Sequence, residues 1–178
     1  MSFAVEGAAH DDAARLNALI TNDTSSEVRF GAEGNSAPHV TIALGEADGD
    51  DTARVVALVT HAVRKLEPFT MSFGPVEREH VTGEYVLASV VVEHAVRRWR
   101  SLLREQIARH LSGLGRMTDE PHLTLAVVED SCRKAVDDLL DRARPGISAC
   151  EVTHVDVAHA GRRGVKGELI RRLTLGSP

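Results

Sequence analysis

The sequence predicts a compact α+β fold of two similar lobes related by a pseudo-twofold axis. The first observation is an internal repeat. Pro38–Leu44 (PHVTIAL) returns 83 residues later as Pro121–Val127 (PHLTLAV), with an identical or conservatively exchanged residue at every position. The second observation is that strand-like and helix-like patterns flank both copies in the same order. No Pro-, Gly- or Ser-rich linker separates the halves, so we expect a single bilobal domain over residues 1–178.

The first half of the chain predicts the order strand, helix, strand, helix, strand. Alternating aliphatic residues after Pro38 are typical of a strand that begins at a proline. Pro68 ends the second helix, and the Asp and Thr residues before that helix cap it. The expected elements are a strand at 2–5, a helix at about 11–20, a polar loop at 21–37, the motif strand at 38–44, a helix at about 52–66 and a strand at 69–73.

The second half predicts the same order. Apolar residues at helical spacing indicate a helix that ends near Leu111, and Pro145-Gly146 ends the last helix. The expected elements are a strand at 85–92, a helix at about 94–111, the motif strand at 121–127, a helix from about 129 to 144, and strands at 147–157 and 169–175.

Composition narrows the class of function. The chain has 43% hydrophobic and 26% charged residues, which is typical of a soluble globular protein. A net charge of −5 argues against binding along long nucleic acids, because such proteins carry a broad basic surface. Aromatic residues make up only 3% of the chain, which argues against a base-stacking platform for single strands. A local basic site for a small anion is compatible with both observations.

The sequence also predicts a compartment. No apolar run reaches the ~18–20 residues of a membrane span, and the first residues lack the pattern of a signal peptide. The two cysteines, Cys132 and Cys150, form no CxxC pair. The remaining histidines form no HExxH or His-x-His pair. We therefore expect a cytoplasmic monomer with no membrane contact, no metal and no cofactor.

The repeated motif carries the chemistry. Residues i and i+2 of a strand face the same side, so His39 points with Thr41, and His122 points with Thr124. A pseudo-twofold arrangement would bring both pairs to one small volume. With an imidazole pKa near 6.5, one histidine can accept a proton near pH 7 while the other donates one. Two hydroxyls can meanwhile hold the oxygens of a phosphate. This set suits phosphodiester chemistry without a metal ion.

The specificity of this signal lies in the duplicated context. A single His-x-Ser/Thr triplet is expected by chance in a chain with nine histidines, and two more occur at His80 and His110. Neither of them lies in a sequence like the repeat.

Two His-x-Thr motifs about 80 residues apart, each followed by alternating aliphatic residues, resemble the 2H phosphoesterase superfamily. This group includes the bacterial 2′-5′ RNA ligases and the RNA 2′,3′-cyclic phosphodiesterases. Phe69–Gly74 and the last strand, Val165–Leu175, are also similar to segments of that family. The resemblance implies a mainly antiparallel sheet in each lobe, helices packed outside, and a cleft that holds both motifs. It also implies metal-independent hydrolysis of a 2′,3′-cyclic phosphate to the 2′-phosphate.

The resemblance assigns His39 and His122 as acid and base, in an order that the sequence leaves open, and Thr41 and Thr124 as phosphate-orienting groups. Arg163 and Lys166, in the turn between the last strands, are candidates for binding the substrate phosphate or belong to a solvated hairpin tip. Tyr85 is a candidate contact for the base. The expected partner is a small cyclic nucleotide or an RNA 3′ end.

Two features distinguish this chain within the family. Ala126–Glu129 (AVVE) follows the second motif, where many bacterial members place an arginine, and aromatic residues are few. Both favour a smaller or unusual cyclic nucleotide over RNA. The alternatives are a 2′-5′ RNA ligase, which uses the same residues in reverse, and a protein that binds cyclic nucleotides without cleaving them.

Overall fold

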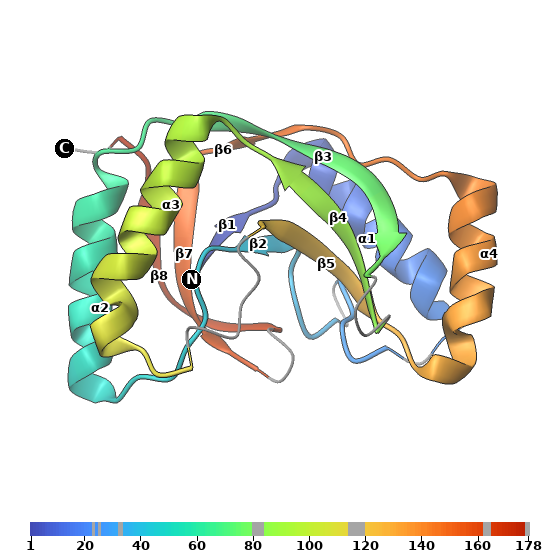
Figure 1. Ribbon diagram of the computed structural model, residues 1–178, viewed down its shortest axis with the longest axis horizontal. Helices are drawn as coiled ribbons and strands as arrows, with labels where there is room; N and C mark the ends of the chain where they lie inside the picture. The colour runs from blue at the N-terminus through green and yellow to red at the C-terminus, as the bar shows by residue number, and fades with distance from the viewer. Residues whose placement is uncertain are drawn as a thin grey trace.

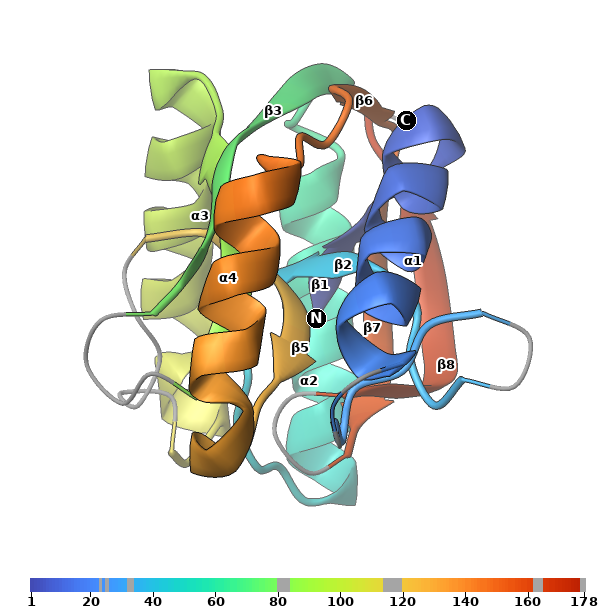
Figure 2. The same cartoon turned by 90° about the vertical axis from the view of Figure 1, so that its right-hand side faces the viewer.

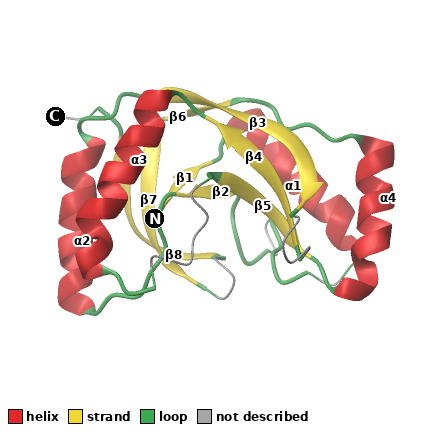
Figure 3. Cartoon of the chain, viewed as in Figure 1, coloured by secondary structure: helices red, strands yellow, loops and turns green. Residues whose placement is uncertain are grey.

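A single curled sheet of eight strands organises the chain (Figures 1 and 3). The computed structural model describes residues 1–22, 24, 26–31, 34–79, 84–113, 120–161 and 165–176. The strand order is β6-β3-β4-β5-β2-β1-β7-β8, and every neighbouring pair is antiparallel. The strands are β1 (Ser2–Ala4), β2 (His39–Thr41), β3 (Phe69–Arg78), β4 (Tyr85–Val91), β5 (His122–Val127), β6 (Cys150–Val152), β7 (His154–Ala160) and β8 (Lys166–Thr174). The helices are α1 (Gly7–Asn22), α2 (Gly49–Val63), α3 (His94–Ile107) and α4 (Arg133–Ala143), with short 3₁₀ turns at Ala108–His110 and Asp130–Cys132.

The strand order confirms the predicted α+β fold with its internal symmetry. The two motif strands, β2 and β5, are neighbours at the centre, and the strands on either side correspond in pairs: β1 with β4, β7 with β3, and β8 with β6. Helices α2 and α3 pack together on one side, and α1 and α4 lie on the other side (Figures 1 and 2). Because α1 comes from the first half and α4 from the second, the two halves of the sequence interleave.

The core lies on one face of the central strands. Phe3, Val40, Leu123 and Val155, from four neighbouring strands, are all buried. The Phe3 ring packs edge-on against Phe69, with ring centroids 5.2 Å apart. This packing fixes which way the alternate residues of β2 and β5 must point.

Helix α2 begins three residues earlier than the sequence predicts, at Gly49 instead of 52. Its N-cap is Asp48, whose carboxylate accepts a hydrogen bond of 2.9 Å from the backbone N–H of Asp51. Helix α1 likewise begins at Gly7, before the predicted residue 11, and Ala9 adds to its buried face.

The predicted strand at 147–157 is two strands. Val152 of β6 pairs with Phe69 at one end of the sheet, whereas His154 of β7 pairs with Thr174 near the other end. Only Thr153 lies between them. The two ends of the sheet therefore come together at this residue, which requires the strong curl seen in Figure 1.

The hairpin of β7 and β8 bends sharply. Pairs Ala160–Lys166 and Asp156–Arg172 enclose four residue steps on β7 (156 to 160) but six on β8 (166 to 172), with two register shifts between them. Extra residues on one strand bend a ladder toward the other. The end of the hairpin accordingly turns toward the middle of the molecule (Figure 1).

Candidate active site

The four motif residues lie on one face of two adjacent strands. Val40 of β2 pairs with Leu123 of β5, and both are buried. In an antiparallel ladder this register places His39 across from Thr124, and Thr41 across from His122. Directly opposite residues share a face, so the four side chains point together away from the core. All four are partly exposed, which agrees with that orientation.

The register also sets the spacing. Directly opposite residues have Cβ atoms about 4.5–5.5 Å apart, and diagonal neighbours lie about 7–8 Å apart. His39 and His122 are diagonal neighbours, so their rings can approach one tetrahedral phosphorus from two sides. Each threonine lies beside the imidazole of the other motif. The arrangement suits two proton-transfer groups and two hydrogen-bond donors acting on one phosphate.

Both histidines make the same hydrogen bond. Nδ1 of His39 lies 2.8 Å from the carbonyl oxygen of Ala37, and Nδ1 of His122 lies 3.2 Å from that of Glu120. A carbonyl oxygen only accepts, so each Nδ1 carries the proton and donates it. Proton exchange with a substrate then falls to Nε2 of each ring.

The proline of each motif places this carbonyl. A residue that precedes proline is held in an extended conformation, which orients its own carbonyl. The carbonyl oxygens of Pro38 and Pro121 accept hydrogen bonds from Val5 N (3.2 Å) and Val90 N (3.1 Å), which lie at the corresponding ends of β1 and β4. The repeated Pro-His dipeptide thus fixes both the strand start and the ring orientation.

Asn17 is a structural residue of the site that the sequence analysis did not identify. It is 2% exposed. Its side-chain N–H groups donate to Leu125 O (2.6 Å) and Val28 O (2.9 Å), and its side-chain oxygen accepts from Phe30 N (2.8 Å). Asn17 therefore joins α1 to β5 and to the segment before the first motif. The available signal was a polar residue among the buried helical positions Ala13, Leu16 and Ile20.

Lys166 belongs to an ion cluster around a buried carboxylate. Its Nζ lies 2.5 Å from Oδ2 of Asp156, which is 0% exposed, and Arg172 binds both oxygens of the same carboxylate at 2.8 and 2.9 Å. Burial favours the neutral carboxyl, but hydrogen bonds from Arg172 and Lys166 outweigh it and lower the pKa of Asp156. Asp156 pairs with Ser2, which pairs with Thr41, so this cluster shares the face of the motif residues.

Tyr85 lies on the same face at the first position of β4. It alternates with buried residues and shares its side with Leu87, the partner of Thr124, and Ser89, the partner of His122. A Cβ at Gly74 would clash with the Ser89 hydroxyl, so glycine allows β3 to approach this row. The other predicted substrate-binding residue, Arg163, lies outside the described residues.

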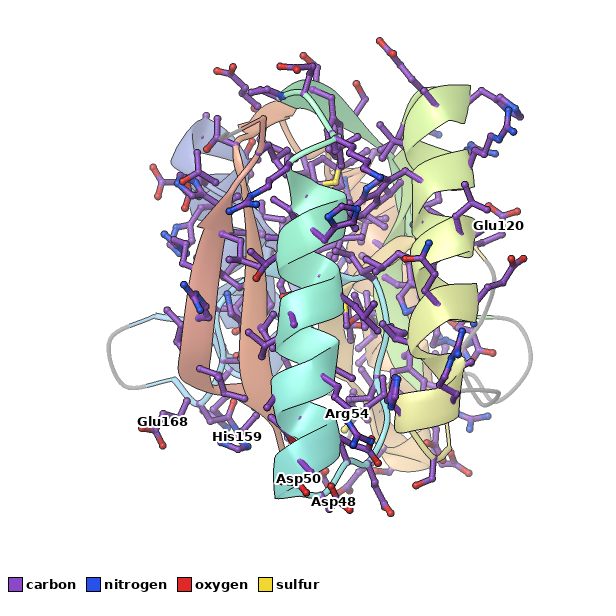
Figure 4. The ribbon with its side chains drawn as sticks, turned by 90° about the vertical axis from the view of Figure 1, so that its left-hand side faces the viewer. Asp48, Asp50, Arg54, Glu120, His159 and Glu168 are labelled. Atoms are coloured by element: carbon purple, nitrogen blue, oxygen red, sulfur yellow. The ribbon has the colours of Figure 1, made fainter. Side chains whose placement is uncertain are left out.

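A separate cavity of about 320 Å³ lies between the start of α2, the loop that follows β2 and the end of β7. Figure 4 labels His159 at this end of β7, and Asp48 and Asp50 at the start of α2. The residues that line the cavity include Ala43, Leu44, Val55, Val157 and Ile170. None of the four motif residues lines it.

In the described part of the chain, no three His, Cys, Asp or Glu side chains form a group that could hold a metal ion. Within the same residues, no helix combines the length and apolar character of a membrane span.

Comparison with known proteins supplies the family. A family model described as the 2′-5′ RNA ligase superfamily matches residues 9–164. The chain belongs to the 2′-5′ RNA ligase superfamily. This confirms the resemblance to the 2H phosphoesterases that the two His-x-Thr motifs predict. No curated protein matches the sequence.

A solved structure agrees with the fold. The chain resembles the crystal structure of TT0787 of Thermus thermophilus, with a TM-score of 0.62 and 14% sequence identity. The match covers 98% of this chain and 96% of that chain. At this identity the likeness concerns the fold alone. Membership of the 2′-5′ RNA ligase superfamily indicates a phosphoesterase- or ligase-type enzyme.

Proposed function

We propose that this enzyme hydrolyses a 2′,3′-cyclic phosphate on a small nucleotide or an RNA 3′ end to the 2′-phosphate, without a metal ion. The observation that carries the proposal is the pairing of β2 with β5, with His39 across from Thr124 and Thr41 across from His122. A ring-strained cyclic phosphodiester needs one proton acceptor and one proton donor on opposite sides of phosphorus. The two imidazoles provide this pair.

The step balances with these groups alone. One imidazole takes a proton from water through Nε2 while the water oxygen bonds to phosphorus. The bond from phosphorus to the 3′ oxygen breaks, and the other imidazolium gives its Nε2 proton to that oxygen. The product is the 2′-phosphate, and each histidine ends with the proton state of its counterpart. Exchange with solvent restores the starting state.

The threonines stabilise the negative charge that develops on the non-bridging phosphoryl oxygens. Thr41 and Thr124 donate hydrogen bonds to the two non-bridging oxygens, each from beside the opposite imidazole. Donors placed before the reaction stabilise the transition state without reorganisation.

The second motif and Tyr85 support a small substrate. Ala126, Val127 and Val128 after the motif are buried, so this segment contributes apolar packing instead of a cation for an RNA chain. Tyr85 stands on the site face, where its ring can stack on one base. A mononucleotide with a cyclic phosphate needs no more than these contacts.

A substrate panel tests this proposal. Purified enzyme in EDTA is offered the four 2′,3′-cyclic mononucleotides, a short RNA with a cyclic-phosphate end, and that RNA with a 5′-hydroxyl partner strand. We expect opening of a cyclic mononucleotide to the 2′-phosphate at a rate that EDTA leaves unchanged. Phosphorus NMR distinguishes the 2′ from the 3′ product.

Three results would contradict the proposal. A strict requirement for added metal would exclude the two-histidine step as the whole of the chemistry. Joining of the RNA ends without turnover of mononucleotides would assign a ligase. Stoichiometric retention of an unaltered cyclic nucleotide would assign a binding protein.

A further inference from the structure

The Asp156–Lys166 pair joins the two strands of the bent β7–β8 hairpin and has no part in the chemistry above. The Asp156 side chain is 0% exposed and the Lys166 side chain 12% exposed. Burial of two charges is unfavourable unless good geometry and additional hydrogen bonds compensate for the lost hydration. Here the carboxylate receives three hydrogen bonds from Lys166 and Arg172. Such a pair contributes less to stability than to fixing one geometry of the chain around it.

The geometry that the pair fixes is the bend of β8. Lys166 lies six residues before Arg172, yet both side chains reach the same carboxylate. A straight strand would place these two residues about 20 Å apart, beyond the combined reach of their side chains. The ion pair therefore holds the bent end of β8 against the site face.

The bent end is tied to the first motif. The backbone N–H of Lys166 donates to the hydroxyl oxygen of Ser36 at 3.1 Å. Ser36 directly precedes Ala37, whose carbonyl accepts the Nδ1 proton of His39 at 2.8 Å. Movement of Ser36 thus reorients the peptide that determines the ring position and tautomer of His39.

We propose that Asp156 and Lys166 are positioning residues for His39, acting through Ser36 and the Ala37 carbonyl. Lys166 is then part of the support of the site and does not itself bind the substrate phosphate. If the Lys166 ammonium bound a phosphate instead, the Asp156–Lys166 ion pair would be broken. Within the cluster the buried carboxylate would then keep Arg172 as its partner, and the bent end of β8 would no longer be held in place. The kinetic test of this inference rests on the proposed function, whereas the structural test at His39 does not depend on that function.

Two variants test the coupling from Lys166 through Ser36 to His39, and each has a matched control variant. Lys166→Met keeps the length of the side chain and removes its charge, and Lys134→Met makes the same change in an exposed pair with Asp138 on α4. Ser36→Ala removes the hydroxyl at a partly exposed position outside the core, where the fold tolerates change. Ser36→Thr restores the hydroxyl.

The kinetic result expected is a fall in kcat. Misplacement of a catalytic group by a distant change can cost up to ~10²-fold, so we expect roughly a 10-fold loss of kcat for Lys166→Met and a smaller loss for Ser36→Ala. KM stays within about twofold, since no substrate contact is removed. Ser36→Thr recovers the rate, and Lys134→Met leaves it unchanged. The double variant that combines Lys166→Met with Ser36→Ala loses no more kcat than Lys166→Met alone.

The structural result expected is a change at His39 seen by ¹⁵N NMR. In the wild type the ring carries its proton on Nδ1, whereas in Lys166→Met and Ser36→Ala the Nδ1–H and Nε2–H tautomers exchange. Folded variants that keep both the wild-type tautomer and kcat would overturn the inference, as would fully additive losses in the double variant. If the wild type turns over no cyclic phosphate, the proposed function fails, and the tautomer measurement alone decides the positioning role.

Discussion

Replacement of His39 or His122 by alanine is expected to lower kcat for a 2′,3′-cyclic nucleotide by ~10²–10⁴-fold. Each imidazole carries one of the two proton transfers, and water replaces it poorly because water is a weaker acid and base at neutral pH. KM changes much less than kcat, because the threonine hydroxyls still bind the phosphate. Steady-state kinetics measures kcat and KM, and circular dichroism checks that each variant is folded.

The double variant gives a sharper result. Residues that act as a unit show strongly non-additive losses, so His39→Ala with His122→Ala should lose little more activity than either single change. His61→Ala is the matched control, since His61 is an exposed histidine of α2, and it should retain the wild-type rate. A His39→Ala or His122→Ala enzyme with near wild-type kcat would remove that residue from the mechanism.

Substitution of Asn17 by alanine is expected to lower the free energy of unfolding by about 2–4 kcal/mol. The change leaves the Leu125 carbonyl and the Phe30 N–H without their Asn17 partner, whereas the Val28 carbonyl keeps a hydrogen bond of 3.2 Å from the Ser26 hydroxyl. Each buried polar group left unsatisfied costs about 1–3 kcal/mol. Urea unfolding followed by circular dichroism measures the loss.

Asn22→Ala serves as the control for this prediction. Asn22 ends the same helix and is exposed, so its replacement should change the free energy of unfolding by less than about 1 kcal/mol. Equal stabilities for Asn17→Ala and Asn22→Ala would show that the three hydrogen bonds of Asn17 contribute nothing net. In that case α1 would be held to β5 by its apolar face alone.

The sequence predicts the motif strands because their information is local. Alternation after Pro38 and Pro121 sets the facing of His39 and His122 without knowledge of the rest of the chain. The repeat adds the symmetry. The pairing of Val40 with Leu123 is long-range, and nothing in either copy specifies that the two strands are direct neighbours in one sheet.

The surroundings of the site escape sequence analysis for a different physical reason. Asn17 is held by backbone groups of distant segments, which every residue offers alike. The ion pair between Asp156 and Lys166 depends on two register shifts within one hairpin. Such shifts move a side chain by several ångströms without any change in the alternation of apolar and polar residues in the sequence. The sequence therefore predicts a turn residue at Lys166, although its side chain is largely buried in the structure.

A crystal structure with a nucleoside 2′,3′-cyclic vanadate tests the central arrangement most directly, because vanadium adopts the five-coordinate geometry of the reacting phosphorus. We predict one vanadate held between Nε2 of His39 and Nε2 of His122, with the hydroxyls of Thr41 and Thr124 on its equatorial oxygens. Vanadate reached by a single imidazole, or bound away from strands β2 and β5, would contradict the account.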